Sequence, residues 1–380
     1  MLDMGIFMQV LIHQQMNIIS AAVMLFFIIY SYNVFDKKLK LNKLYLTSLI
    51  LNLLLIMLDT ILAFLIGKDS TPLLVLTRLI RVLVIAIVPY LTFIFIKVVC
   101  NYFPKPFKIK SSTQSVFYIL MLINATIAIS ALFNPKVLNK IVEGIVPLLL
   151  SVIFVAYSIF IVFRSKKMVI RFEFASILAI TLIAIATLIS QIIVSTSSSS
   201  WHDNTIILIF MFVIIQQREL YRDSLTGARN RVVLKKCIDA HANKPNDKLA
   251  AIMVDLDYFK SINDSFGHSE GDYALKTFVK ILQRAYSDHG VVIRMGGDEF
   301  LILIENVSTK EINDMIMRMS KMIDSFNGKS EKPYHIRYSY ASGVYDNRNI
   351  SIEQFIHDLD MKMYQNKKGK RERIWGVKNL

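Results

Sequence analysis

The first 217 residues consist of long apolar segments separated by short polar loops, and the remaining residues have the composition of a soluble domain. A helix crosses the core of a bilayer with about 20 apolar residues. Seven segments meet or approach this length and predict membrane-spanning helices at roughly 16–35, 41–66, 72–99, 115–133, 143–163, 169–194 and 204–217. The first segment has no basic stretch before it and no small-residue cleavage site after it, so we interpret it as a retained helix.

The loops between these segments alternate in charge. Four lysines follow the first segment in DKKLKLNK, three follow the third in NYFPKPFKIK, and four basic residues follow the fifth in RSKKMVIR. The loops after the second, fourth and sixth segments carry one, two and no basic residues. Because basic loops stay in the cytoplasm, the pattern predicts a multi-pass protein of the inner (cytoplasmic) membrane. Its N-terminus is expected outside and its C-terminal half in the cytoplasm.

The chain has 380 residues and a formal net charge of +15. Residues 1–217 contain 17 Lys and Arg against 7 Asp and Glu, whereas residues 218–380 contain 27 against 22. The basic excess therefore indicates membrane topology and not nucleic-acid binding. We expect a transmembrane sensory region at 1–217, a soluble domain at 218–380 and a linking helix at about 214–224. The two cysteines, Cys100 and Cys237, lie in different halves and are interpreted as free thiols.

Three charged residues lie within the predicted spans, where charges are costly and often functional. Asp59 is near the outer end of the second span, and Arg78 and Arg81 share one face of the third. One interpretation is a buried sensor cluster that lines a ligand pocket. The alternative is a structural ion pair, or arginines that extend to the membrane interface.

The soluble half contains an apolar run, Leu249–Val254, that predicts a buried strand ending in Asp255 and Asp257. Acidic side chains at the end of a buried strand are costly unless a cation or hydrogen-bond donors compensate them. Hard oxygen ligands suit Mg²⁺, which binds through one or two carboxylates together with substrate phosphates. Lys260 would supply a further positive charge for phosphate.

A second motif, RMGGDEF at 294–300, lies between two short branched apolar runs and predicts a hairpin. Gly296 and Gly297 permit positive φ and close approach of a ligand to the backbone. Asp298 and Glu299 emerge at the turn, and one carboxylate could meet the Asp255 strand across a sheet. Such a pair would hold two Mg²⁺ on a triphosphate for in-line displacement at phosphorus.

Four separated motifs, DSLTGARNR, DLDYFKSINDSFGHSEGD, RMGGDEF and LDMKMYQNKKGK, together resemble the GGDEF-type diguanylate cyclases over about residues 223–375. The resemblance implies an α/β (α+β sandwich) domain whose central sheet is flanked by helices, as in the polymerase palm and the nucleotidyl cyclases. It implies condensation of two GTP to cyclic di-GMP and two pyrophosphates across a homodimer, with cyclic di-GMP effectors downstream. With the seven-helix all-α transmembrane bundle, it predicts a membrane-bound cyclase regulated by its N-terminal half.

The resemblance also implies roles for individual residues. The expected metal ligands, for two Mg²⁺ per site with Mn²⁺ as an alternative, are Asp255, the carbonyl of Leu256, Asp298 and Glu299. Glu299 is otherwise the base for the 3′-hydroxyl, and Arg294 stabilises charge near the reacting phosphate. The expected GTP contacts are Asn263 and Asp272 for guanine, and Phe259, Lys260, Gly296, Gly297, Lys367, Lys370 and Arg371 for phosphates. An aspartate acceptor suits guanine, because adenine does not offer the same donors.

Two departures from the family pattern bear on function. The RxxD inhibitory motif is replaced by SDHG at 287–290, which puts product inhibition in doubt. The closing motif NKKGKR is one residue short, so that either Lys370 or Arg371 takes the role of its arginine. A catalytically inactive receptor that binds GTP or a protein partner is therefore the alternative to an active enzyme.

Overall fold

In a computed structural model, the chain divides into two compact units, Met1–Ile215 and Gln216–Leu380. The structure describes residues 2–37, 39–65, 70–103, 107–133, 146–164, 171–193, 201–242, 248–286, 290–345 and 350–378. Several predicted loops, including 134–145 and 194–200, lie outside these residues.

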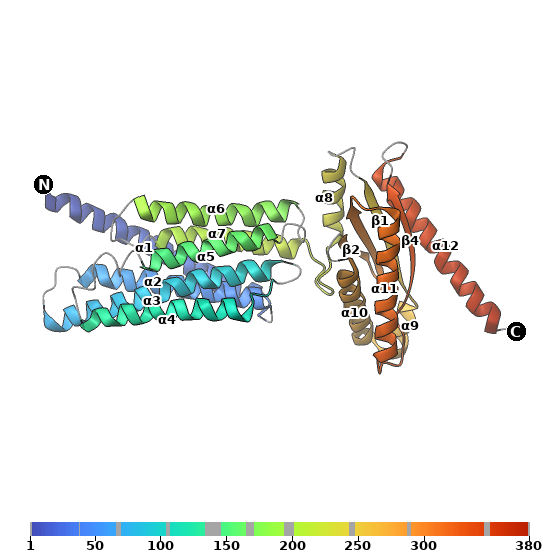
Figure 1. Cartoon of the computed structure of the whole chain (residues 1–380), viewed down its shortest axis with the longest axis horizontal. Helices are drawn as coiled ribbons and strands as arrows, with labels where there is room; N and C mark the ends of the chain where they lie inside the picture. Colours follow the sequence, from blue (N-terminus) through green and yellow to red (C-terminus); the bar gives the residue numbers. More distant parts are fainter. Residues whose placement is uncertain are drawn as a thin grey trace. The chain divides into compact units, whose positions relative to one another are not determined.

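The first unit consists of helices in its described part (Figure 1). The described part of each predicted apolar segment falls on one of them: α1 (Leu2–Val34), α2 (Lys40–Leu65), α3 (Thr71–Tyr102), α4 (Ser111–Phe133), α5 (Val146–Arg164), α6 (Arg171–Ile193) and α7 (Trp201–Leu220). Within the described residues, four helical stretches are long and apolar enough to cross a membrane: Gln14–Val34, Lys40–Leu65, Thr71–Tyr102 and Ser111–Ser130. The apolar parts described in α5 and α6 are shorter, at Leu148–Arg164 and Glu173–Thr187.

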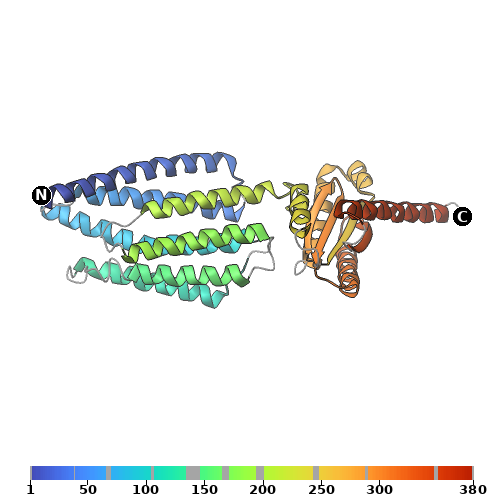
Figure 2. The same ribbon diagram turned by 90° about the horizontal axis from the view of Figure 1, so that it is seen from above.

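Three hydrogen bonds between side chains connect α1, α2 and α7. Asn17 Nδ2 on α1 donates to Asp59 Oδ2 on α2 at 2.9 Å, and Asn52 Nδ2 on α2 donates to Thr205 Oγ1 on α7 at 3.0 Å. Ser20 Oγ on α1 lies 3.1 Å from His202 Nδ1 on α7. Figure 2 shows α7 beside α1 and α2, as these contacts require. Each of these hydrogen bonds requires the helix faces that carry its two partners to lie against each other.

Helix α7 ends at Leu220, four residues before the expected end of the linking helix. The segment that follows forms a turn, in which Asp223 N donates to Ala228 O and Gly227 N donates to Asp223 O, both at 2.9 Å. Asn230 Nδ2 reaches back to the carbonyl of Leu220 at 2.8 Å. Asn230 thus satisfies one of the carbonyls that a helix leaves unpaired at its end. The helix ends at Leu220, before Gly227.

The second unit is built on a four-stranded antiparallel sheet with the order β2-β3-β1-β4 (Figure 1). Its strands are β1 (Leu249–Asp257), β2 (Gly290–Gly296), β3 (Glu299–Glu305) and β4 (Arg337–Tyr345). Its helices are α8 (Arg231–Ala242), α9 (Phe259–Phe266), α10 (His268–Tyr286), α11 (Thr309–Lys329) and α12 (Ile352–Lys378). The predicted strand at 249–254 and the predicted hairpin around the two glycines are both present.

The central strand β1 is buried on both faces, and its side chains alternate between two cores. Ile252 and Val254 pack in the core that contains residues of α10 and α11, whereas Ala251 and Met253 pack in the core that contains residues of α12. By the same alternation, Asp255 points to the α12 face. The two acidic residues of β1 are therefore placed beneath the C-terminal helix.

Both outer edges of the sheet are covered. On β2, Arg229 N donates to Val292 O at 3.0 Å, and Arg294 N donates to Arg229 O at 2.7 Å. On β4, side chains of α12 donate to outward-facing carbonyls, Asn366 Nδ2 to Tyr340 O at 3.0 Å and Lys370 Nζ to Tyr338 O at 2.8 Å.

Candidate active site

A cluster of carboxylates lies where β1 and the β2–β3 hairpin meet. In the register of the sheet, Asp255 is the direct partner of Glu299, and Leu256 N donates to Asp298 O at 3.2 Å. The expectation that an acid of the hairpin meets the Asp255 strand across the sheet is therefore confirmed in its geometry. Both motifs contribute to one site.

Asp255 is 5% exposed, and its carboxylate accepts a hydrogen bond from the ammonium of Lys367 on α12. Burial raises the pKa of Asp255 to about 6, because the charged form loses its hydration. Lys367 opposes this rise in pKa, while the nearby Asp298 and Glu299 add to it. The site thus holds a carboxylate whose negative charge is only partly compensated by the protein.

Glu299 has a raised pKa as well, first through partial burial and then through the neighbouring carboxylates of Asp360 and Asp298. Within the described ranges, no three acidic, histidine or cysteine side chains are arranged to hold a metal by themselves. Mg²⁺ is commonly bound by one or two carboxylates, water and substrate phosphates, so a donor set that is incomplete without substrate fits this ion. One or two of Asp255, Asp298 and Glu299, together with substrate phosphates and water, could hold it.

The hairpin turn consists of Gly297 and Asp298, and Gly297 has a φ of +48°, which a residue with a side chain rarely adopts. A Cβ atom on Gly296 would meet nothing within 4 Å, so the backbone there is open to a ligand. The Arg294 side chain binds this turn: its Nε and Nη2 donate to the carbonyl of Gly297 at 3.0 and 2.7 Å. Its Nη1 donates to Asp223 Oδ1 at 2.8 Å.

Arg294 therefore connects the glycine turn to the segment that follows α7. Asp223 Oδ1 also accepts from the backbone and hydroxyl of Thr226, at 2.8 and 2.6 Å. Burial raises the pKa of Asp223, but the bonds from Thr226 and Arg294 outweigh it and hold the pKa below its usual value. The structure places the Arg294 guanidinium on these protein partners, where it positions the turn.

The residues expected to bind guanine lie on two consecutive helices, Asn263 on α9 and Asp272 on α10. The helices are joined at Gly267, which has a φ of +83°. A Cβ atom on Gly271 would lie 1.9 Å from Asn263 Oδ1, so the Asn263 amide rests directly on the glycine. Neither side chain makes a hydrogen bond within the part of the chain that the structure describes. Both are therefore available to a base.

Phe259 and Lys260 form the start of α9, directly after β1. No side chain caps this helix, and the first N–H groups of an uncapped helix favour an anion. The backbone here suits the expected contact with phosphates.

The C-terminal basic residues divide into different environments. Lys367 contacts Asp255, whereas Lys370 donates to the carbonyl of Tyr338 on the edge of the sheet. Arg371 belongs to α12, but its side chain lies outside the described part, as do residues 287–289 of the SDHG segment. The choice between Lys370 and Arg371 as the phosphate contact stays open.

The proposed sensor residues lie in the helical unit. Asp59 accepts from the fully buried Asn17, and Arg78 and Arg81 are half-buried on α3, one turn apart.

Sequence reasoning assigned no role to Asp223 or Gly271. Both belong to motifs quoted above, but their functions depend on partners that sequence does not reveal, Arg294 and Asn263. A glycine within a helical pattern was the one available signal for Gly271.

Comparison with known proteins finds similarity over the domain that carries this site. A family model described as "Diguanylate cyclase, GGDEF domain" matches residues 220–373. The probable diguanylate cyclase DgcF of Escherichia coli (strain K12) is 30% identical over 161 residues, which are 40% of this chain and 50% of that protein. The cyclic di-GMP phosphodiesterase NbdA of Pseudomonas aeruginosa is 28% identical over 148 residues, 38% of this chain and 19% of that protein.

Among solved structures, the GGDEF domain of DgcB from Caulobacter crescentus in complex with c-di-GMP is 21% identical. The match covers 39% of this chain and 91% of that one, with a TM-score of 0.36. The chain spans half or less of the length of the two relatives named above. The motifs and the family match coincide: over residues 220–373 this chain is similar to the GGDEF domain family.

Proposed function

We propose that this protein is a membrane-bound diguanylate cyclase that condenses two GTP molecules to cyclic di-GMP and two pyrophosphates. The observation that carries the proposal is the buried Asp255, which lies opposite Glu299, is close to Asp298 and is bonded to Lys367. Carboxylates that are only partly compensated, at the ends of inner strands, suit the binding of a cation together with substrate phosphates. The relative named as a probable diguanylate cyclase, DgcF, supports the same reaction.

In the reaction, the 3′-oxygen of each GTP forms a bond to the α-phosphorus of the other. The bond from that phosphorus to the bridging oxygen breaks, and pyrophosphate leaves with the electron pair. The proton of the 3′-hydroxyl passes to a base, which is Glu299 where that carboxylate is not itself a ligand of the metal. Asn263 and Asp272 hold the guanine, and the Gly296–Gly297 backbone and the start of α9 approach the phosphates.

We propose Mg²⁺ as the cofactor, held by Asp255, Asp298 and Glu299 with the carbonyl of Leu256, and with Mn²⁺ as an alternative. When bound, the metal compensates charge on the phosphates and activates the attacking oxygen. The protein contributes position: Arg294 fixes the turn that carries Asp298, and the sheet register fixes Asp255 opposite Glu299.

We propose that the active form is a homodimer, because the product requires two GTP molecules and one site of this kind binds one. Activity should then rise more steeply than linearly with protein concentration at low concentration. A specific activity independent of concentration in a demonstrated monomer would refute this part.

We propose that seven helices cross the membrane, with the N-terminus outside and the GGDEF domain in the cytoplasm. The basic loops after the first, third and fifth segments support this orientation. Reporter fusions at the loops between helices would contradict it if the loop after α1 proved external. Signals would reach the domain through α7, whose end is tied by Asn230 to the segment that Arg294 binds.

The test is production of cyclic di-GMP from GTP and Mg²⁺, followed by mass spectrometry. The proteins are the purified full chain, Asp298→Ala, and Asp314→Ala as a control with an exposed acid removed from α11. We expect product from the wild type and the control, and at least ~100-fold less from Asp298→Ala, as for loss of one group that stabilises transition-state charge. Equal activity of the wild type and Asp298→Ala would refute the proposed site.

The alternative function is an inactive receptor that binds GTP or a protein partner. Its support is the shortened closing motif and the placement of Lys370 on Tyr338. GTP binding without product in the wild type would favour this alternative.

A further inference from the structure

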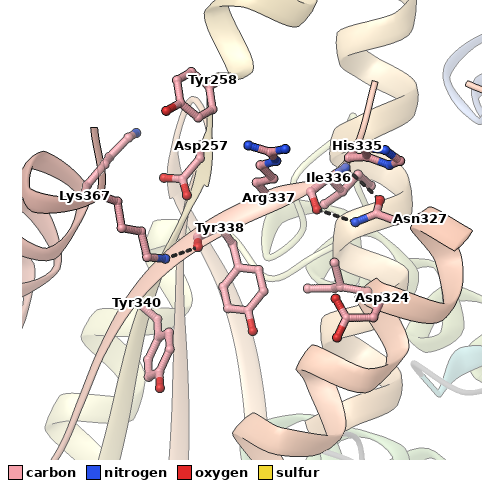
Figure 3. A pocket seen from close by; sticks show the side chains of 12 residues that line it. Asp257, Tyr258, Asp324, Asn327, His335, Ile336, Arg337, Tyr338, Tyr340 and Lys367 are labelled. Carbon is pink, nitrogen blue, oxygen red and sulfur yellow. Dashed lines mark hydrogen bonds between the residues drawn. The ribbon is translucent and has the colours of Figure 1, made fainter. Parts of the chain in front are cut away.

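A pocket with a volume of about 680 Å³ opens beside the candidate active site, next to the end of β1 (Figure 3). Asp257 at the end of β1 and Tyr258 directly after it line the pocket on one side. Arg337 and Tyr338 line it from the edge strand β4, and Lys367 lines it from α12. Since Lys367 also bonds to Asp255, the pocket and the carboxylate cluster share a side chain.

The sheet places Arg337 on the same face as the carboxylates. In the β1–β4 register, Asp255 pairs with Ser339, and Asp257 pairs with Arg337. The side chains of direct partners in a sheet point to the same face. Asp255 and Arg337 are diagonal neighbours, whose Cα atoms lie roughly 7–8 Å apart. The intervening Asp257 is already engaged, because its Oδ1 accepts from Ser339 Oγ at 2.8 Å.

The basic residues of this pocket differ in what they bind. Lys367 is held by Asp255, and Lys370 is held by the carbonyl of Tyr338. The Arg337 side chain is exposed, and its guanidinium makes no hydrogen bond or ion pair with any residue that the structure describes. It is therefore a cation beside the site with its donors still available.

The backbone that carries Arg337 is fixed in place. Asn327 on α11 donates from Nδ2 to the carbonyl of Ile336 and accepts from its N–H, both at 2.9 Å (Figure 3). An anchored backbone lowers the entropy lost when the side chain binds a ligand. A planar guanidinium with paired donors matches phosphate oxygens better than an ammonium does.

We propose that Arg337 binds the β- and γ-phosphates of GTP and the pyrophosphate that they become on cleavage. The inference rests on the proposed function and adds a phosphate-binding residue that lies outside the four sequence motifs. When the bond between the α-phosphorus and the bridging oxygen breaks, the electron pair and its negative charge move to the leaving pyrophosphate. In this proposal, the Arg337 guanidinium binds that pyrophosphate from the pocket.

The experiment measures binding without turnover. Calorimetry with the purified full chain gives the affinities for pyrophosphate and for GMP, which lacks the two outer phosphates. The proteins are the wild type, Arg337→Gln, Arg337→Lys, and Lys321→Gln as a control that removes an exposed cation from α11 outside this pocket. Steady-state kinetics with GTP give KM and kcat for the same set.

We expect Arg337→Gln to weaken pyrophosphate binding about tenfold and to raise KM for GTP similarly, as for loss of one charge-assisted contact. GMP affinity should stay unchanged, and Arg337→Lys should restore part of the loss. Pyrophosphate affinity within about twofold of the wild type, or an equal loss in Lys321→Gln, would overturn the proposal.

The two proposals fail in different ways. Pyrophosphate binding that depends on Arg337 in a chain that makes no cyclic di-GMP would leave this inference standing and refute the cyclase. Normal cyclase activity with pyrophosphate binding unaffected by Arg337→Gln would do the reverse.

Discussion

Replacing Asp255 by asparagine perturbs the buried carboxylate with little change of shape. In the metal-free protein, the folded state favours the protonated form of Asp255, because its pKa rises from the usual 3.8 to about 6. The contribution to stability is therefore most favourable below pH 3.8, is lost as the pH rises toward about 6, and is constant above that value. The wild type should become less stable through this window, relative to Asp255→Asn.

The magnitude follows from the shift in pKa. One pKa unit corresponds to about 1.4 kcal/mol, so the full window is worth about 3 kcal/mol. Between about pH 4.5 and pH 7.5 the part expected is about 2 kcal/mol.

The assay is urea unfolding of residues 216–380, wild type and Asp255→Asn, at a series of pH values without metal. The measured quantity is the difference in unfolding free energy between the two proteins, so that groups common to both cancel. Asp314→Asn, at an exposed position of α11, is the matched control and should show no such trend. A difference for Asp255→Asn that is constant with pH within about 0.5 kcal/mol would refute the reasoning, since linkage requires the slope.

Two further substitutions test residues that position the site's side chains and are not expected to contact GTP. Gly271→Ala should raise KM for GTP about fivefold with kcat little changed, because its Cβ would displace the Asn263 amide and cost about one hydrogen bond; unchanged KM would contradict the assignment of Asn263 to guanine. Asp223→Asn should lower kcat about tenfold in the full chain, because it weakens the hold of Arg294 on the carbonyl of Gly297; full activity would show that the turn needs no such support.

Much of the soluble fold could be predicted from local patterns. The apolar run before Asp255 predicts a buried strand, and the two glycines between branched apolar runs predict a hairpin, because both signals depend on neighbours in sequence. The meeting of Asp255 with the hairpin acids was also expected, since both motifs end strands. The structure adds the register that pairs Asp255 with Glu299.

The remaining parts depend on contacts between distant residues. Lys367 reaches Asp255 from 112 positions away, and Arg294 reaches Asp223 from 71 positions away. Arg337 lies in no motif, and only strand pairing places it on the face of the carboxylates. The end of α7 at Leu220 was placed too late because the turn that stops it depends on the side chain of Asn230.

The covered edges of the sheet have a consequence for crowding. In the proposed membrane-bound state, copies of the domain share a plane and collide often, and an open strand edge would template pairing between neighbouring copies. Here Arg229 forms backbone hydrogen bonds with Val292 and Arg294 on β2, and Asn366 and Lys370 occupy two carbonyls of β4. Repeated collisions can therefore bring GTP-loaded faces together without seeding strand exchange and aggregation.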